Sequence, residues 1–473
     1  MTVLWNKNIN LFLSKITTTE LSIFNGKLKT TCMNLDVDKQ TLADLALFPN
    51  SQQKQSVLSL LGKTQTIEGQ ERLSAMFSTA LSDSKKIEER IAVFAYLQYN
   101  EVNFNIDKNI CDFAEFYLKG HSPAQKFPLF IGLLNRIVYA FNSNNDYYII
   151  QQGVFSILKL LEELRQFADH LTVKAPKLLL AYKSTITDTC QSDDFAWINE
   201  LKGKAKLTAG ETAKADHLFR NAAHHDLKSL LDITYELDAY LTVSASSKAR
   251  GFTLPVIAES QEATLTFKGL FHPFLNHPIG NDVDFNIERN ICFITGTNMA
   301  GKSTLLKAMG VAVYLSQLGF PVPAGYMKTS LFNGLITTIN LSDDIDQGHS
   351  HFYREVLRVK QVAQKVNQSK HVFVIFDELF RGTNVKDAYD ASLAIISAFT
   401  DVRSCFFVVS THIVEVAHQL VKNESINFRY METTFADGHP FNSYQLKEGI
   451  TEERLGMWIV NNERILEIIK GSK

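Results

Sequence analysis

Thr295-Gly296-Thr297-Asn298-Met299-Ala300-Gly301-Lys302-Ser303-Thr304 is the stretch of sequence that decides the fold. It matches the phosphate-binding pattern G-x-x-x-x-G-K-[ST], with Gly296, Gly301, Lys302 and Ser303 at the required places. The glycines let the backbone turn tightly enough for consecutive N–H groups to face an anion. Lys302 brings a positive charge to the outer phosphates of a nucleotide, and the Ser303 hydroxyl can ligate Mg²⁺.

The residues on either side of this loop have the patterns of a strand and a helix. Residues 290–294 form a short apolar run that predicts a buried strand, and residues 305–318 have helical apolar spacing. A strand, a glycine loop and a helix N-terminus in that order make an anion site from backbone dipoles alone. A chance match in an ordinary glycine loop is the alternative, and the flanking pattern disfavours it.

The composition is that of a globular protein with several domains. The chain has 473 residues, of which 45% are hydrophobic and 21% are charged, and its formal net charge is −2. At this length we expect about three domains. The small net charge argues against a strongly basic nucleic-acid protein of the histone kind, although it leaves room for a local basic patch.

The cysteines and the apolar segments bear on the cellular compartment. The five cysteines (Cys32, Cys111, Cys190, Cys292 and Cys405) are scattered and lack C-x-x-C spacing. They predict reduced, mostly buried thiols rather than a disulfide frame or a zinc site. Residues 127–141 are the most membrane-like, but Arg136 interrupts them and they are too short to span a bilayer, so a buried helix is expected there. We therefore expect a cytoplasmic protein without a membrane partner.

The chain divides near residues 250–260 into an all-α part and an α/β part. Residues 57–99 and 113–241 have helical spacing, with a break at Pro176, and a further helix is predicted at 227–245, ended by the serines at 244–247 and Gly251. Short apolar runs alternate with helices at 296–450, which predicts a parallel sheet covered by helices. The expected domains are an N-terminal segment (1–50), a helical domain (51–255), an α/β domain (256–460) and a C-terminal tail (461–473).

Polar residues follow two of the predicted strands. Asp377 and Glu378 come directly after the apolar run at 372–376, and His412 follows the run at 405–409. A carboxylate at a strand end next to the phosphate loop suits the metal side of a Mg–nucleotide site, and Glu378 is a candidate general base for a water. Singly, Asp377 could be a helix cap and His412 a surface histidine. Together with the loop, these residues favour a catalytic site.

These motifs resemble those of the MutS mismatch-repair ATPases, an ABC-class group. Residues 295–304 resemble the family's TGPNMxGKST loop, and residues 342–355 resemble its segment ending in S-T-F-x-x-E. Residues 377–387 are similar to its DELGRGT-plus-Asp pattern, 410–412 to its closing T-H, and 444–449 to its Y-K-L-x-x-G strand. In the helical part, Thr64, Thr66 and Gly69 resemble a T-x-T-x-x-G motif, and Leu237-Asp238 resembles the L-D that closes the lever helices. The resemblance runs from about residue 35 to 455.

The resemblance implies a multidomain fold, with an all-α core and lever region followed by an ABC-type ATPase domain. It implies ATP and Mg²⁺ as cofactors, with Ser303 and Asp377 on the metal, Glu378 activating water and His412 sensing the γ-phosphate. Ser350 of one chain would complete the site of a second chain in a homodimer. The implied nucleotide-binding residues are Gly296, Thr297, Asn298, Met299, Ala300, Gly301, Lys302, Ser303, Thr304 and Ser350.

The sequence also departs from the family pattern. Thr297 stands in place of the usual Pro, His351 in place of Thr, and Asn384 in place of Ser. Near residues 278–279, where the family places an aromatic residue to stack the adenine, this chain has none. The family's N-terminal mismatch-reading and connector domains have no counterpart within the 473 residues, and the DNA clamp between the levers is short or absent.

Two functions are consistent with this resemblance and with the departures from the family pattern. The first is a homodimeric, slow and DNA-modulated Mg–ATPase of DNA repair or recombination. It would bind duplex or branched DNA without wedge-type mismatch reading, alongside a repair-pathway protein partner. The second is an ATP-driven conformational switch that grips a protein partner and has lost DNA binding. A small-molecule P-loop kinase is a weaker third reading, because Glu378 and the Ser350 segment argue against it.

Overall fold

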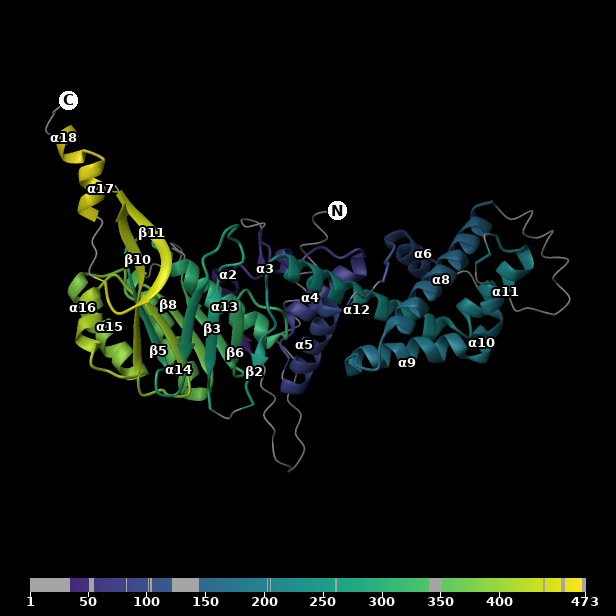
Figure 1. Ribbon diagram of the computed structural model, residues 1–473, viewed down its shortest axis with the longest axis horizontal. Helices are drawn as coiled ribbons and strands as arrows, with labels where there is room; N and C mark the ends of the chain where they lie inside the picture. Colours follow the sequence, from purple (N-terminus) through teal and green to yellow (C-terminus); the bar gives the residue numbers. More distant parts are fainter. Residues whose placement is uncertain are drawn as a thin grey trace. The chain divides into compact units, whose positions relative to one another are not determined.

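The computed structural model in Figure 1 describes twelve stretches of the chain, all within one compact unit, Met33–Lys473. These stretches are residues 35–50, 55–81, 83–100, 102, 104–120, 144–201, 203–204, 206–259, 262–339, 351–436, 439–451 and 456–469. Ser350 and the helix predicted at 127–141 lie outside them. Within these stretches, no helix combines the length and the apolar character needed to cross a membrane.

A seven-stranded sheet carries the phosphate loop. Its order is β1-β7-β8-β9-β5-β10-β11, and all neighbours run parallel except β10 and β11. The strands are β1 (Asp36–Val37), β5 (Ile291–Thr295), β7 (Gly334–Thr338), β8 (Val372–Asp377), β9 (Phe406–Ser410), β10 (Ile426–Ala436) and β11 (His439–Glu448). The strands predicted at 290–294, 372–376 and 405–409 are confirmed as β5, β8 and β9, to within one residue at each end.

Helices cover both faces of this sheet, as expected for a parallel sheet with buried strands. Successive side chains of a strand point to opposite faces. Cys292 and Ile294 therefore join one core, and Ile291 and Phe293 join another. The first core also contains the apolar residues of α13, and the second contains those of α14, α15 and α16. These helices are α13 (Lys302–Gln317), α14 (His351–Gln368), α15 (Val385–Phe399) and α16 (Val414–Leu420), with α17 (Gly456–Asn462) and α18 (Ile465–Ile469) after β11.

A smaller four-stranded sheet takes three of its strands from before the phosphate loop and one, β6, from after it. Its order is β2-β6-β3-β4, and β3 pairs antiparallel with both β4 and β6. The strands are β2 (Val256–Ile257), β3 (Leu265–Leu270), β4 (Asn281–Phe285) and β6 (Tyr326–Thr329). The predicted change from helices to strands after residue 255 is thus confirmed.

The region before β2 is helical, as the apolar spacing predicts. Its helices are α3 (Val57–Leu60), α4 (Ile67–Ser78), α5 (Ser84–Tyr99), α6 (Lys108–Lys119), α8 (Asn144–His170), α9 (Lys177–Gln191), α10 (Asp193–Ala196), α11 (Ala209–Arg220) and α12 (His224–Ala249), with a 3₁₀ helix, η1 (Trp197–Leu201), between α10 and α11. Pro176 is the N-cap of α9, so the predicted break there is confirmed. Within the described residues the four cysteines are buried, in agreement with the sequence.

The predicted end of α12 at the serines 244–247 is wrong, because the helix continues to Ala249. Ser244 and Ser247 are buried in the helix, and the Ser246 hydroxyl donates to the carbonyl oxygen of Leu60 at 2.7 Å. Tertiary packing therefore outweighs the modest helix propensity of serine. Gly251 does follow the helix end, with a left-handed φ of 70° that suits glycine.

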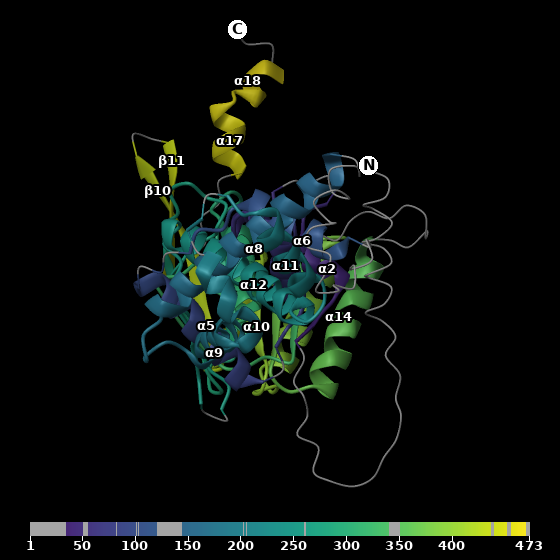
Figure 2. The same cartoon turned by 90° about the vertical axis from the view of Figure 1, so that its right-hand side faces the viewer.

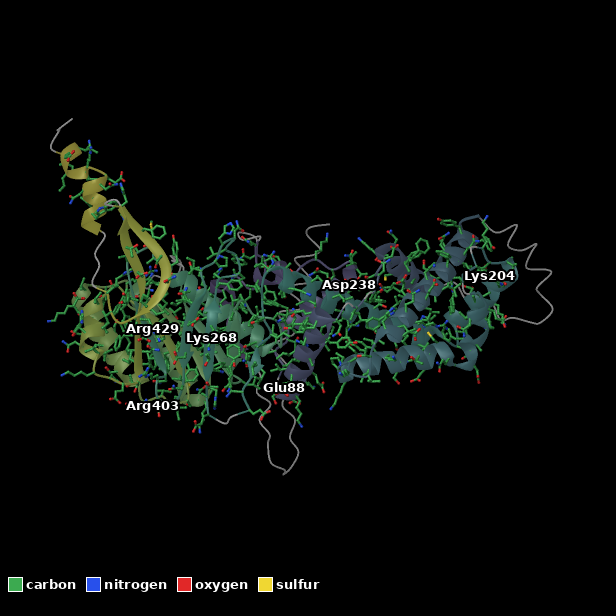
Figure 3. The ribbon with its side chains drawn as sticks, viewed as in Figure 1. Glu88, Lys204, Asp238, Lys268, Arg403 and Arg429 are labelled. Carbon is green, nitrogen blue, oxygen red and sulfur yellow. The ribbon has the colours of Figure 1, made fainter. Side chains whose placement is uncertain are left out.

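Two motifs far apart in the sequence meet at Asp238, labelled in Figure 3. The buried Asp238 carboxylate accepts hydrogen bonds from the backbone N–H groups of Gln65 (3.0 Å) and Thr66 (2.8 Å). Thr66 also caps α4 by accepting from the N–H of Gly69 at 3.0 Å. The T-x-T-x-x-G and L-D motifs therefore join α4 to α12, which is a structural role in the helical region.

The C-terminal end of α13 contacts the helical region directly. The Arg90 guanidinium, from α5, donates to the carbonyl oxygen of Leu318 at 2.8 Å, and the Tyr314 hydroxyl donates to the carbonyl oxygen of Phe77 at 2.7 Å. Gly319 follows with a φ of 70° and packs so closely on Ile87 that an added Cβ would lie 2.8 Å from its carbonyl oxygen. One helix thus runs from the phosphate loop to the helical region.

Residues just before the helical region belong to the large sheet, which the sequence did not indicate. β1 pairs in parallel with β7, and the following helix, α2 (Lys39–Asp44), packs against that strand. The Asp44 carboxylate accepts from the Thr337 hydroxyl at 2.7 Å and from the Ile339 N–H at 3.0 Å. Figure 2 shows α2 beside α14, and the Asp38–Arg358 ion pair joins the two.

Candidate nucleotide site

The phosphate loop lies between β5 and α13 and needs glycine at two positions. Gly296 has a φ of 140° and Gly301 a φ of 97°, conformations that L-residues with a Cβ avoid. Gly301 is the N-cap of α13 and makes no side-chain capping bond, so it leaves the first N–H groups of that helix open to an anion. Met299 adds a third left-handed residue, with a φ of 66°. The loop is therefore already folded for phosphate.

The Lys302 side chain lies over this loop, and its ammonium group points toward the loop backbone. The side chain is buried, and its Nζ donates to the carbonyl oxygens of Gly296 (2.8 Å) and Thr297 (3.0 Å). Burial lowers the pKa of Lys302 below its ordinary value of 10.5, although the nearby carboxylates of Glu378 and Asp377 act to raise it. When a phosphate binds, the Lys302 ammonium group would exchange these two neutral carbonyl acceptors for a negatively charged one.

The β10–β11 hairpin braces the loop by side-chain hydrogen bonds. The hydroxyls of Thr297 and Thr433 lie 3.0 Å apart, and the Thr433 hydroxyl donates to Oδ1 of Asn442 at 3.0 Å. Asn442 in turn donates from Nδ2 to the carbonyl oxygen of Met299 at 3.2 Å. Thr297 stands where the resembling family has proline, so this chain gains a hydroxyl that ties its loop to the hairpin.

Asp377 and Ser303 are the two residues that are expected from the sequence to bind magnesium. Asp377 ends β8 opposite Ser410 at the end of β9, and its Oδ1 accepts a hydrogen bond from the Ser410 hydroxyl. Ser303 is exposed in the first turn of α13. In the described ranges no three His, Cys, Asp or Glu side chains gather into a metal cage.

Glu378 lies beside Asp377 and has partners on both oxygens. His412 Nε2 contacts Oε1, and Arg381 Nη1 lies 3.0 Å from Oε2. Burial acts to raise the pKa of Glu378, but the His412 hydrogen bond and the charges of His412 and Arg381 outweigh it, so this pKa lies below its ordinary value of 4.5. The carboxylate is therefore ionised at neutral pH. The structure thus brings together Lys302, Asp377, Glu378 and His412 at the carboxyl ends of β5, β8 and β9, as predicted from the strand ends.

Tyr444 is a site residue that the sequence reading missed. The tyrosine lies on β11, its side chain is half-exposed, and its Cδ1 would be 3.2 Å from a Cβ added to Gly301. The backbone around it is fixed by Asn281, which donates to the Tyr444 carbonyl at 3.0 Å and accepts from the Leu446 N–H at 2.7 Å. The ring therefore offers an aromatic face beside the phosphate loop, although residues 278–279 have none. Its place in the Y-x-L-x-x-G motif was the available signal.

Comparison with known proteins finds a matching domain over the part of the chain that contains the phosphate loop. A family model described as MutS domain V matches residues 292–470. The chain is 28% identical to the DNA mismatch repair protein MutS of Shouchella clausii over 230 residues, which cover 47% of this chain and 26% of that protein. It is 28% identical to the MutS of Fervidobacterium nodosum over 321 residues, covering 66% of this chain and 34% of that protein.

A eukaryotic relative is matched over a longer stretch. The chain is 26% identical to the DNA mismatch repair protein MSH3 of Saccharomyces cerevisiae over 373 residues, covering 69% of this chain and 36% of that protein. The matches thus span between 26% and 36% of the length of these curated relatives. The match to MutS domain V and the extension of the similarity into the helical region support membership of the MutS family.

Proposed function

We propose that this chain is a Mg²⁺-dependent ATPase that acts on DNA as a homodimer. One observation carries the ATPase part: a buried Lys302, the Asp377 side chain and the ionised carboxylate of Glu378 converge at the mouth of a preformed phosphate loop. The relatives named above are DNA mismatch repair proteins, which supports DNA as the polymer on which the protein acts.

Each residue has a proposed part in hydrolysis. Lys302 and the N–H groups of the loop bind the β- and γ-phosphates, while Ser303 and Asp377 hold Mg²⁺, which neutralises phosphate charge when bound. Glu378 accepts a proton from the attacking water. His412 and Arg381 each contact one oxygen of the Glu378 carboxylate, and each oxygen keeps a second lone pair that can accept from that water. His412 is proposed to contact the γ-phosphate.

The base of the nucleotide is proposed to lie on Tyr444. Its half-exposed ring lies beside Gly301 at the N-terminus of α13, and Asn281 holds the Tyr444 backbone by donating to its carbonyl oxygen. Stacking on an aromatic ring stabilises a bound base by about 1–3 kcal/mol. Ser350 of a partner chain is proposed to complete the site, as the family resemblance implies.

An ATPase assay with a DNA titration tests this function. The full chain is incubated with ATP and Mg²⁺, with and without duplex and branched DNA, at several salt concentrations. We expect slow hydrolysis that changes on DNA addition, and DNA affinity that falls as salt rises. Failure to bind any of these DNAs at low salt contradicts the DNA role. Failure to hydrolyse ATP under all conditions contradicts the enzymatic role.

A further inference from the structure

The turn after β8 has a backbone that needs external support. Glu378 has a φ of 60° and Phe380 a φ of 62°, so two residues with side chains adopt the left-handed conformation within three positions. Strained backbone of this kind persists at functional sites only when surrounding contacts fix it. The Glu378 N–H donates to the Ser410 carbonyl at 3.0 Å, which fixes the start of the turn.

Glu355, from α14, fixes the end of the same turn. One carboxylate oxygen accepts from the Arg381 N–H at 3.1 Å, and the other accepts from the Gly382 N–H at 3.2 Å. Glu355 is only 5% exposed, and His351 Nδ1 lies 3.6 Å from its Oε1. Burying a carboxylate is costly unless its hydrogen bonds compensate. Here the compensating donors are the backbone of the turn that carries Glu378.

Contacts one helical turn further along hold α14 itself in place. The Arg358 guanidinium is 7% exposed and donates from Nη2 to the Thr337 carbonyl at 2.6 Å and to Oδ1 of Asp38 at 3.2 Å. Glu355 and Arg358 are three residues apart, so they lie on the same side of α14. Glu355 therefore connects a firmly held helix to the catalytic turn.

At Gly382 the turn packs so closely against α14 that there is no space for a side chain. A Cβ added there would lie 2.6 Å from the Phe352 backbone nitrogen and 2.8 Å from His351 Nδ1. The first turn of α14 and residues 378–382 therefore pack as one unit. Arg381, whose N–H is bound by Glu355, also holds the Glu378 carboxylate through its guanidinium at 3.0 Å. Loss of the Glu355 contacts would displace both the backbone and the side-chain partner of Glu378.

We propose that Glu355 is a positioning residue for ATP hydrolysis, which acts by holding the turn that carries Glu378. The proposal rests on the proposed function, because Glu378 must act on water for its position to matter. Glu355 is not expected to contact the nucleotide. Its removal should therefore slow the chemical step while leaving nucleotide affinity unchanged.

Glu355→Gln and Glu355→Ala in the full chain test this role. Gln keeps the shape but places an amide NH₂ against a backbone donor, whereas Ala removes both acceptors. We expect the single-turnover rate to fall roughly ten- to a hundredfold, with the Kd for ATP within about twofold of wild type. Gln364→Ala, an exposed position on the same helix, is the matched control and should leave both quantities unchanged.

A double-mutant comparison separates a positioning role from a general structural one. If Glu355 acts through Glu378, adding Glu355→Ala to Glu378→Gln should lower the residual rate by less than about twofold. Full additivity of the two rate losses would overturn the proposal. So would an unchanged rate in both Glu355 variants, or a loss of ATP binding in step with the loss of rate. An inactive wild-type protein would instead contradict the proposed ATPase function.

Discussion

Nζ of Lys302 donates a hydrogen bond to the carbonyl oxygen of Gly296 at 2.8 Å, so the lysine at the end of the phosphate loop binds the residue at its start. A second contact, to the Thr297 carbonyl, completes this arrangement. Both acceptors are neutral dipoles, and charge-assisted bonds to a phosphate are the stronger partners for an ammonium. Nucleotide binding is therefore expected to draw Lys302 off the two carbonyls.

Lys302→Ala should abolish ATP binding. The variant loses the charge at the phosphate position, and we expect the Kd for ATP to rise by at least about a hundredfold. Equilibrium titration with a fluorescent ATP analogue measures this change. Lys307→Ala, on the same helix but outside the loop, is the control and should bind normally. ATP affinity of wild-type strength in Lys302→Ala would show that the loop is not the phosphate site.

Tyr444→Ala should weaken ATP binding through the base rather than the phosphates. Loss of about 1–3 kcal/mol of stacking corresponds to a Kd that rises between about fivefold and 150-fold. Tyr444→Phe keeps the ring and should bind like wild type. Phe441 is an exposed aromatic residue on the same strand, so Phe441→Ala is the control. Equal effects of Tyr444→Ala on ATP and on inorganic triphosphate would contradict a role in base stacking.

Asp38 should stabilise the fold in a pH-dependent way. Burial acts to raise its pKa, but hydrogen bonds from Arg358 and the Thr41 N–H outweigh that effect, so the pKa lies below its ordinary value of 3.8. The unfolded chain therefore takes up the proton first as the pH falls. The stabilisation is fully present above pH 3.8 and is lost as the pH falls through the pKa of the folded state.

Asp38→Asn should accordingly lower the free energy of unfolding by about 1–2 kcal/mol at pH 7, because the Asp38 side chain is 40% exposed and water screens part of the ion pair. The difference from wild type should shrink below pH 3.8, because Asp38 of the unfolded wild-type chain becomes protonated there before Asp38 of the folded protein does. Urea unfolding at pH 7 and at pH 3.5 measures both values. Asp36 pairs with Lys365 but has a side chain that is 63% exposed, so Asp36→Asn should cost less than about 1 kcal/mol. A loss for Asp38→Asn that does not depend on pH would contradict the ionic role of Asp38.

The phosphate loop and the polar residues at the strand ends could be predicted from the sequence because both depend on local patterns. β5, β8 and β9 follow from apolar runs, and parallel strands place Lys302, Asp377 and His412 at one edge of a sheet. These features need no knowledge of long-range contacts. The contact between Glu378 and His412 could have been predicted in the same way, because both residues follow strands that end at this edge of the sheet.

The missed features depend on partners distant in the sequence. β1 is two residues long and is recognisable only by its pairing with β7, almost 300 residues later. Tyr444 reaches the phosphate loop because the β10–β11 hairpin folds over Gly301, which no periodicity reveals. α12 continues through three serines of modest helix propensity because burial of Ser244 and Ser247 outweighs that propensity. Domain bounds, a dimer completed by Ser350 and DNA binding without wedge-type mismatch reading stay predictions.

Single-turnover hydrolysis by Glu378→Gln tests the central claim most directly. The substitution keeps the shape of the side chain and removes its basicity, while Lys302 and Asp377 stay in place to bind ATP and Mg²⁺. We expect the variant to bind ATP with wild-type affinity and to release phosphate at least about a hundredfold more slowly. Phosphate release by Glu378→Gln at the wild-type rate would contradict the assignment of Glu378 as the general base, and with it this account of the site.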